Sequence, residues 1–559
     1  MALQKNDRVP LTITALSSDG NGVGRFDGQA VFVPFTAVGD VITAHIVKVC
    51  KSHAYGIVQE IAQPGPGRIA PDCTLHGKCG GCCFRHLSYE AELAAKQTFV
   101  EDAMRRLGGL DAAVLPILPS PSAERYRNKV QYPLTVDAEG NVQAGFYAPR
   151  SHRVLPCGDC KLQPQLLNEI ARTVCRLLTE LKISVYSEAA HNGFVRHLYL
   201  RHAVTTDKVL CCLVCNGRKF PHREEFCRRL VQAHPQVDSV VCNVNTRDTN
   251  VIIGEECITL YGAGLLADTL SGVPVELSPL SFYQVNTRGA ERLYAEVRRM
   301  AALTGTELLL DLYCGAGTIG LSMADACRQL VGVEIVPQAV ENARANAARM
   351  GAQNTEFLCA DAAEAARDLA ARVLRPDVVV LDPPRKGCGP AALAPVLAMG
   401  PRRIVMVSCN PATAARDAAW LVQNGYQAEA VRPVDLFPRT RHVETVVLFS
   451  LKKTDSVINA KVEFGEGEGK VSLDKIAKRA EAYKPKERVT YKMIKEYIEA
   501  KYGFKVHTAY IAEVKRELGL PMYDAPNAVE ELKQPRKHPT AEKVEAIKDA
   551  LRHFSLYES

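Results

Sequence analysis

The chain has 559 residues, of which 47% are hydrophobic and 23% are charged. This composition is ordinary for a globular protein and excludes a mainly disordered or collagen-like chain. No stretch approaches the roughly 18 apolar residues of a membrane span, and the N-terminus turns polar so early that we expect no signal peptide. The formal net charge of +7 is compatible with nucleic acid binding but does not require it.

Cysteine is unusually frequent, and all 19 cysteines lie between Cys50 and Cys409. Dense disulfides belong mostly to short secreted scaffolds, whereas this chain is long and shows no export signal. We therefore expect a reducing cytoplasm, with metal or catalytic roles for a minority of the thiols. Because residues 410–559 contain no cysteine, the tail and the cysteine-bearing part look like separate units.

The N-terminal part is predicted to be a small β-barrel, which we assign to residues 1–62. The turn signals Asp19-Gly20 and Asn21-Gly22 separate short apolar runs, a pattern typical of hairpins. The predicted strands are residues 11–16, 30–35, 41–49 and 54–61.

The next segment, residues 63–272, is predicted to be a central mixed α+β domain. It holds a cluster of cysteines and a probable helix over residues 89–107. Residues 209–215 and 239–244 read as strands of this domain.

Residues 273–452 alternate between apolar runs and alanine-rich helical stretches, which predicts a doubly wound, mostly parallel sheet of Rossmann-like type. From residue 453 the chain becomes a charged extension, with 22 Lys and Arg against 18 Asp and Glu over 452–559. Its apolar residues predict amphipathic helices near 489–502 and 540–554. The predicted strands of the Rossmann-like part are residues 307–312, 330–333, 378–381 and 403–407.

A glycine-rich turn follows the first of these strands, where Gly315, Gly317 and Gly320 match G-x-G-x-x-G. The pattern is weak alone, because either a dinucleotide or S-adenosylmethionine needs a close backbone approach there. Glu334 ends the next strand, and its carboxylate could accept ribose hydroxyls from either cofactor.

Three further segments place reactive side chains at the same edge of the sheet. Asp382 ends a buried strand before two prolines, and Cys409 ends the following strand. His442 and Glu444 come two residues apart further on. Ligands of open α/β folds bind at this carboxyl edge.

Five motifs follow one another along the chain: Phe282/Gln284/Asn286, Asp311–Gly317, Asp382–Gly387, Ser408–Pro411 and Pro438–Glu444. In this order, they make the chain similar to the S-adenosylmethionine-dependent RNA uracil-C5 methyltransferases. More closely, it resembles the members that carry a TRAM domain and an iron–sulfur cluster, the 23S rRNA uracil-5-methyltransferase type. The resemblance spans roughly residues 8–450.

The resemblance implies Cys409 as the nucleophile that adds to C6 of uracil and Glu444 as the base that removes the C5 proton. Thr318 departs from the asparagine that some members carry there, and His442 is left open as a helper of the base, an RNA contact or a packing residue. The positions implied to hold S-adenosylmethionine or the target base are Gln284, Tyr313, Glu334, Asp361 and Asp382.

The cysteine spacing C-x5-C-x2-C suits either zinc or an iron–sulfur cluster, and spacing alone does not separate them. The resemblance implies a [4Fe–4S] cluster, with Cys83 and Cys157 as spare thiols. Cys212 and Cys215 lie in an apolar run and are expected to pack in the core. The implied cluster ligands are Cys73, Cys79, Cys82 and Cys160.

RNA is the expected partner, because residues 8–62 resemble the TRAM module, a small barrel comparable to oligonucleotide-binding barrels. The segments 126–129 and 193–197 combine basic residues with aromatics, as RNA contacts do, although structural turns would look alike. The target uracil must leave its stack to reach Cys409. We expect 23S rRNA as substrate, with tRNA as the alternative, and a monomeric enzyme of the cytoplasm.

Two readings from other classes compete. Radical methylthiotransferases combine a TRAM module with a cysteine cluster, but their C-x3-C-x2-C spacing differs from the five residues between Cys73 and Cys79. A non-catalytic RNA-binding protein would leave Cys409, Asp382 and Glu444 unexplained. RNA cytosine-C5 methylation uses similar thiolate chemistry on different cysteine motifs.

Overall fold

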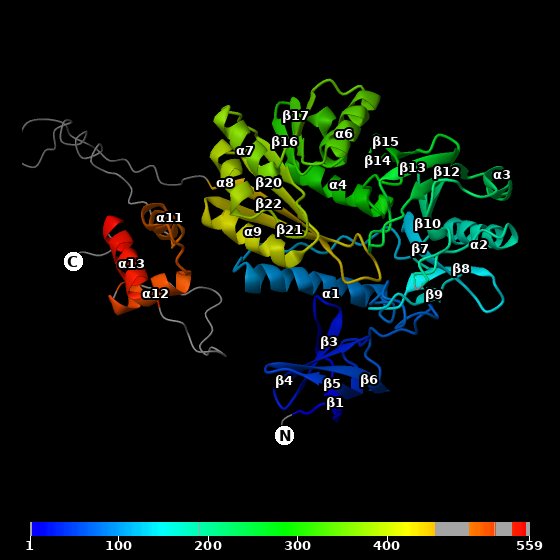
Figure 1. Cartoon of the computed structure of the whole chain (residues 1–559), viewed down its shortest axis with the longest axis horizontal. Coiled ribbons are helices and arrows are strands. Elements are labelled where there is room, and N and C mark those ends of the chain that lie inside the picture. Colours follow the sequence, from blue (N-terminus) through cyan, green and yellow to red (C-terminus); the bar gives the residue numbers. More distant parts are fainter. Residues whose placement is uncertain (1–2, 189, 453–490, 519, 521–538, 555–559) are drawn as a thin grey trace, which may run out of the picture. The chain divides into compact units, whose positions relative to one another are not determined.

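The structure is a computed structural model in which the chain forms two compact units, Met1–Lys453 and Thr454–Ser559 (Figure 1). Within the described part, no helix is long and apolar enough to cross a membrane. The described residues are 3–188, 190–452, 491–518, 520 and 539–554.

The first unit begins with a six-stranded sheet of order β1-β5-β6-β4-β3-β2. Inward residues alternate with outward ones along its strands, and the inward set, including Val31, Val33 and Ile42, forms a separate core. The strands are β1 (Arg8–Thr12), β2 (Ala15–Leu16), β3 (Asn21–Phe26), β4 (Gln29–Pro34), β5 (Val41–Val49) and β6 (His53–Gln63).

One turn predicted for this sheet, at Asn21-Gly22, was wrong. Both residues lie inside β3 rather than in a turn. Glycine is needed at position 22 because a Cβ there would meet Thr36 Oγ1 at 1.8 Å. The tight turn between β3 and β4 is formed by Asp27 and Gly28, both with positive φ, as a two-residue hairpin requires.

A single long helix follows the barrel, as the sequence predicts. Helix α1 (Tyr89–Asp102) is capped by Ser88, whose side chain accepts from the amide of Ala91, and continues as a wide turn to Leu107. Val100 and Met104 of this segment pack into one of the cores of the Rossmann-like sheet. This helix, which the sequence predicted as part of the central domain, therefore packs on the Rossmann-like sheet.

The central domain is a seven-stranded sheet of order β13-β12-β11-β10-β7-β8-β9, in which only β11 and β12 pair in parallel. Cys212 and Cys215 are fully buried in it, so the expectation of core packing is confirmed. The elements are β7 (Lys129–Val136), β8 (Val142–Tyr147), β9 (Val154–Pro156), α2 (Gln165–Glu180), β10 (Val195–Ala203), β11 (Lys208–Cys215), α3 (Arg223–Ala233), β12 (Val237–Val244) and β13 (Glu256–Tyr261), followed by the hairpin β14 (Leu266–Leu270) and β15 (Val273–Leu277).

The Rossmann-like sheet has the order β18-β17-β16-β19-β20-β22-β21, with five parallel strands and an antiparallel pair at one edge. Helices α4 and α6 cover one face, and α1, α7, α8 and α9 cover the other. The elements are α4 (Thr287–Ala301), β16 (Leu308–Leu312), α5 (Thr318–Leu321), β17 (Gln329–Glu334), α6 (Pro337–Met350), β18 (Thr355–Cys359), α7 (Ala362–Ala371), β19 (Val378–Leu381), α8 (Pro390–Met399), β20 (Arg403–Ser408), α9 (Pro411–Gln423), β21 (Tyr426–Val434) and β22 (Glu444–Leu451).

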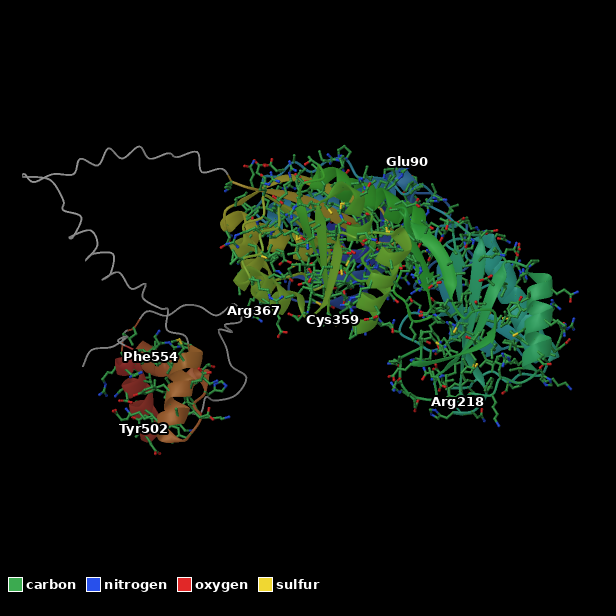
Figure 2. All side chains as sticks on the ribbon, turned by 90° about the horizontal axis from the view of Figure 1, so that it is seen from above. Glu90, Arg218, Cys359, Arg367, Tyr502 and Phe554 are labelled. Carbon is green, nitrogen blue, oxygen red and sulfur yellow. The ribbon has the colours of Figure 1, made fainter. Side chains whose placement is uncertain are left out.

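The second unit holds three described helices, α11 (Tyr491–Tyr502), α12 (Thr508–Glu517) and α13 (Ala541–His553). They share a small core of their own. Figure 2 shows its side chains, with Tyr502 and Phe554 labelled at two helix ends. The sequence predicted α11 and α13 but not α12, whose ten residues span too few turns to show a clear apolar period.

Candidate active site

The carboxyl ends of the parallel strands open into one cavity of about 1780 Å³. It is lined by all of the predicted catalytic and cofactor-binding residues. These are Gln284, Tyr313, Glu334, Asp361, Asp382, Cys409 and Glu444.

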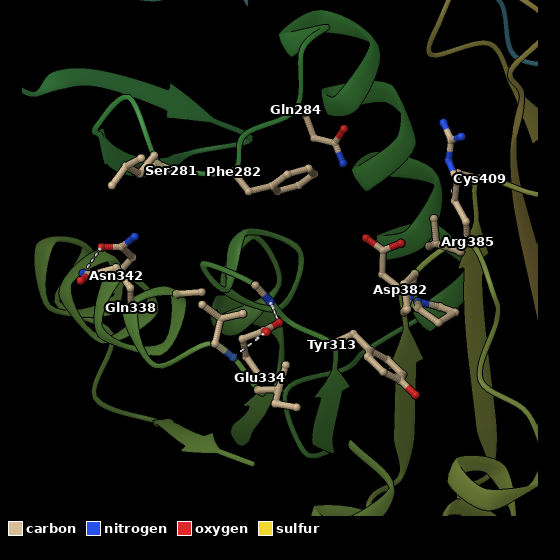
Figure 3. Close-up of a pocket in the computed structure, with 18 of the residues that line it drawn as sticks. Ser281, Phe282, Gln284, Tyr313, Glu334, Gln338, Asn342, Asp382, Arg385 and Cys409 are labelled. Atoms are coloured by element: carbon tan, nitrogen blue, oxygen red, sulfur yellow. Dashed lines mark hydrogen bonds between the residues drawn. The ribbon is translucent and has the colours of Figure 1, made fainter. Parts of the chain in front are cut away.

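The glycine-rich loop after β16 has the close approach that its sequence predicts. Tyr313, Gly315 and Gly317 all adopt positive φ, at 65°, 55° and 77°. A positive φ is costly for tyrosine, so the loop holds this side chain at the cavity under strain. Tyr313 lies beside the loop in Figure 3.

Asp311 holds this loop from beneath, a role that the sequence did not assign to it. Its Oδ2 accepts from the amide of Gly320 at 2.9 Å, and a Cβ at Gly320 would meet the same oxygen at 2.8 Å. Glycine is therefore required at the third motif position by the packing of the helix on the strand. Burial raises the pKa of Asp311 to about 7.

Two backbone amides fix the orientation of the Glu334 carboxylate. Its Oε2 accepts from Gly315 at 3.1 Å and its Oε1 accepts from Val336 at 2.9 Å, so the carboxylate joins the loop after β16 to the end of β17 (Figure 3). Asp361 caps helix α7 by accepting from the amides of Ala363 and Glu364. Both carboxylates are thus fixed at the cavity by backbone donors.

Cys409 and Glu444 come from strands that are neighbours in the sheet. In the pairing of β20 with β22, Ser408 lies opposite Thr445. Because the pair is antiparallel, the next residue on β20, Cys409, lies beside the residue before Thr445, which is Glu444. A thiol and a carboxyl from distant parts of the sequence are therefore brought together at one point of the cavity wall.

The electrostatics of this wall raise three pKa values. Burial, reinforced by Asp382, raises the pKa of Glu444 to about 8, and burial alone raises that of Asp382 to about 7. Burial, reinforced by Glu444, also raises the pKa of the Cys409 thiol. Arg385 opposes the shifts at Cys409 and Glu444, because its positive charge favours both anions.

The loop that carries Arg385 is tied to the start of α9. The hydroxyl of Thr413 donates to the carbonyl of Arg385 at 3.3 Å, and the side-chain Nδ2 of Asn410 donates to the same carbonyl at 3.4 Å. Asn410 also caps α9 by accepting from Ala412 at 3.1 Å. The Asp382–Arg385 turn is therefore joined by hydrogen bonds to the turn that carries Cys409.

His442 lines the same cavity, with Phe437 in an edge-on contact at 6.1 Å between ring centroids. Burial, followed by Arg385, lowers its pKa to about 4. The imidazole is thus neutral near pH 7, so it carries no charge toward a bound base.

The cavity also has lining residues that the predicted site left out. Phe282 is 80% exposed at its rim, within the F-x-Q-x-N motif that the sequence revealed. Gln338 and Asn342 line it from one face of α6 (Figure 3). The available signal was the four-residue spacing between these two polar residues on α6, because residues four apart share a helix face.

The predicted RNA contacts at 126–129 and 193–197 are largely buried, which corrects that expectation. Tyr126 donates its hydroxyl to the carbonyl of Pro438 at 2.9 Å, and Arg196 donates to the carbonyls of Asn245 and Arg247. The side chains of Tyr126 and Arg196 donate to internal carbonyls, so they are not free to stack on bases or bind phosphate. Arg127 is different, because it lines the cavity.

The four predicted cluster ligands, together with Cys157, line a second cavity of about 260 Å³. Cys83 does not line it and packs beside Phe84 instead. No group of three or more His, Cys, Asp or Glu side chains in the described residues is arranged to hold a single metal ion. The four lining ligands are Cys73, Cys79, Cys82 and Cys160.

The sheet with a glycine-rich loop and acidic strand ends defines a methyltransferase of the S-adenosylmethionine-dependent class. Known sequences agree with this class. Residues 275–453 match the tRNA (Uracil-5-)-methyltransferase family, and residues 3–58 match the TRAM domain.

Relatives extend the match over most of the chain. An uncharacterized RNA methyltransferase of Halalkalibacterium halodurans is 40% identical over 451 residues, covering 80% of this chain and 98% of that protein. One of Staphylococcus aureus is 40% identical over 452 residues, covering 81% and 100%. The chain therefore belongs to the TRAM-containing RNA methyltransferases of the uracil-5-methyltransferase family.

A solved structure shares the arrangement. The Pyrococcus abyssi tRNA (uracil-54, C5)-methyltransferase in complex with S-adenosyl-L-homocysteine is 26% identical, with a TM-score of 0.64. The match covers 79% of this chain and 100% of that one. It supports S-adenosylmethionine as the methyl donor here.

Proposed function

We propose that this protein methylates C5 of a specific uracil in RNA through a covalent bond between Cys409 and C6 of the base. One observation carries the proposal: Cys409 and Glu444 face the same cavity from neighbouring strands, beside the glycine-rich loop. This is the pairing of nucleophile and base that the chemistry needs.

Carbon 5 of uracil is a poor nucleophile until a thiolate adds to C6. As the S–C6 bond forms, the electron pair of the C5–C6 double bond moves toward C5 and O4, and C5 can then attack a sulfonium methyl group while the S–CH3 electron pair leaves with the donor's sulfur. Glu444 next takes the C5 proton, the C–H electron pair forms the C5–C6 double bond, and the S–C6 pair returns to Cys409. With a pKa near 8, Glu444 is a stronger base than an ordinary carboxylate.

S-adenosylmethionine, when bound, supplies the methyl group on a sulfonium. The residues present suit it, because Glu334 and Asp361 offer carboxylates for ribose and amino groups, and the glycine-rich loop leaves room for close approach. We assign Gln284, Tyr313 and Asp382 to the same cofactor or to the target base beside it.

We further propose that the second cavity holds a [4Fe–4S] cluster. Four sulfur ligands around a cluster lie farther apart than four around one ion, which fits a cavity of about 260 Å³ lined by five thiols. We assign Cys73, Cys79, Cys82 and Cys160 as the ligands. A cluster here would fasten the segment before α1 to the central domain.

The cluster is tested by the visible absorption and iron content of protein purified without oxygen. We expect brown protein with about four irons, and loss of both in Cys79→Ser. Cys83→Ser is the matched control, because Cys83 does not line the cavity. Bound zinc without iron would refute the assignment.

For the substrate, we propose 23S rRNA, following the resemblance to members with both a TRAM barrel and a cluster. The tRNA alternative is favoured by the solved Pyrococcus abyssi relative, which is a tRNA methyltransferase. We also propose a monomer, working in the cytoplasm.

The decisive experiment deletes the gene and digests rRNA and tRNA separately for mass spectrometry. We expect 5-methyluridine to disappear from one site of rRNA. Loss from tRNA would select the alternative substrate, and no loss from either would favour the non-catalytic RNA-binding protein.

The mechanism is tested in vitro with Cys409→Ala. We expect methyl transfer to vanish while S-adenosylhomocysteine still binds. Cys359→Ala is the matched control, because Cys359 is an exposed cysteine outside the cavity (Figure 2). Full activity of Cys409→Ala would refute the covalent route.

A further inference from the structure

A cluster of fully buried charges lies behind the active-site wall. Lys96 on α1 donates to Glu92 Oε1 at 2.7 Å and to Asp435 Oδ1 at 2.7 Å, and all three side chains are inaccessible to solvent. A third donation goes to the carbonyl of Phe437 at 3.1 Å. The three N–H groups of the ammonium are thus all used.

This cluster joins α1 to the loop 435–443 between β21 and β22. Asp435 opens the loop, and its second oxygen accepts from the hydroxyl of Tyr89 at 2.8 Å. Phe437, Thr440 and His442 of the loop line the cavity, and Glu444 follows directly. What holds the loop therefore holds the proposed base.

Arg439 is the second anchor of the loop. Its φ is 67°, its amide donates to Glu92 Oε1 at 2.7 Å, and its guanidinium donates to Glu124 Oε1 at 3.1 Å. Its carbonyl accepts from the amides of Cys83 at 3.0 Å and Phe84 at 3.2 Å. The loop is thereby fixed to the segment beside the cysteine cavity.

Buried ion pairs contribute little net stability compared with apolar packing, yet removing one partner leaves an uncompensated charge. Four charged groups, Glu92, Lys96, Asp435 and Arg439, meet here where apolar side chains could have filled the space. Lys96 donates to Asp435 and to the carbonyl of Phe437, and Glu92 accepts from the backbone amide of Arg439, so hydrogen bonds from α1 reach three residues of the loop. The arrangement therefore specifies the loop conformation more than it stabilises the fold.

We propose that Lys96 and Arg439 are positioning residues for proton removal by Glu444. The inference rests on the proposed function of Cys409 and Glu444. If Glu444 is displaced, the C5 proton is removed slowly, so the S–C6 bond cannot break and the enzyme stays attached to methylated RNA. Slow turnover should therefore come with more covalent complex.

The test uses the full chain with Lys96→Met and, separately, Arg439→Asn. Asparagine tolerates positive φ, so the second variant removes the guanidinium while sparing the backbone bonds. Lys208→Met is the matched control, because Lys208 is an exposed lysine at the start of β11. Thermal unfolding establishes that each variant is folded.

We expect turnover to fall about 100-fold in both variants, as misplacement of a catalytic group by about 1 Å can cause. The fraction of enzyme bound covalently to RNA on denaturing gels should rise, and S-adenosylhomocysteine affinity should not change. The Lys208→Met control should match wild type. If Lys96→Met does not fold, Arg439→Asn decides alone.

Folded variants with wild-type turnover would overturn the inference. So would slow turnover without more covalent complex, because the loop would then serve some other step. A wild-type enzyme that makes no 5-methyluridine would refute the proposed function instead, and that result is read from the wild type alone.

Discussion

Three acidic or thiol side chains of the active-site wall keep their protons more tightly than usual. Glu444, Asp382 and Cys409 lie together in the cavity wall, with Arg385 the cation that favours the charged forms of Cys409 and Glu444. This arrangement suits a reaction in which protons must move at neutral pH, since a base works best when its pKa lies near the working pH.

The first prediction concerns pH and rate. Cys409 and Glu444 both act as anions, so the rate at which methylated RNA is released should rise with pH through about 8, the pKa of Glu444, and go on rising above it, because burial also raises the pKa of the Cys409 thiol. In Arg385→Gln the profile should move to higher pH, because the cation that favours both anions is gone. Arg402→Gln, an exposed arginine on the sheet edge, serves as control. An unshifted profile would contradict the role of Arg385.

The second prediction concerns pH and stability. Glu444 releases its proton near 4.5 when unfolded but near 8 when folded, so between these values the native state binds more protons. Stability from this group is therefore lost as pH rises through that window. The glutamine in Glu444→Gln does not titrate. The thermal unfolding midpoint of this variant, compared with that of the wild type, should therefore rise between pH 5 and pH 8. Thermal unfolding at several pH values measures this, and a constant difference would contradict it.

At the scale of elements, the site is built from strand ends and the turns that follow them. The sequence predicted this edge well, because buried apolar runs mark the parallel strands and motifs mark their ends. It did not predict the strand order of the central domain, since antiparallel pairing there depends on contacts between distant segments. The turn predicted at Gly22 and the RNA contact predicted at 126–129 were wrong, because local sequence patterns do not report tertiary packing.

The third prediction tests the packing of α5 on β16. In Gly320→Ala the new methyl group would meet Asp311 Oδ2 and a methyl carbon of Leu330, each at 2.8 Å. We expect a loss of about 1–3 kcal/mol in unfolding free energy, as overpacking causes. Affinity for S-adenosylhomocysteine should also fall, because the loop must shift. Urea unfolding and calorimetry measure both, and an unchanged affinity would show that the loop adapts.

At the scale of the whole molecule, the family could be predicted from the sequence because the motifs resemble those of known members. The contacts that position the loop 435–443 could not be predicted from the sequence. The contact of Lys96 with Asp435 joins residues 339 apart in sequence. Nothing in a local pattern marks such a contact. The motifs name the groups that react, and only the structure shows what holds them.

The fourth prediction concerns the second unit. The alignment with the Halalkalibacterium halodurans relative includes 98% of that protein but only 80% of this chain. About a fifth of this chain therefore has no counterpart in the relative. A chain ending at residue 452 should therefore keep its fold and its single-turnover rate. Circular dichroism and methyl transfer measure this, with RNA affinity measured alongside. A weaker RNA affinity would assign the three-helix unit a role in binding RNA, and lost activity would contradict the prediction.

The place of β22 has a consequence for synthesis of the protein. This strand lies between β20 and β21 in the sheet, although it is the last of the sheet's strands along the chain. It begins with Glu444. Until it emerges from the ribosome, β20 presents an unpaired edge, which is a template for aggregation. A chain cut short between Cys409 and Glu444 would carry the Cys409 thiol without its base and would leave the edge of β20 unpaired, so premature termination should yield an insoluble product.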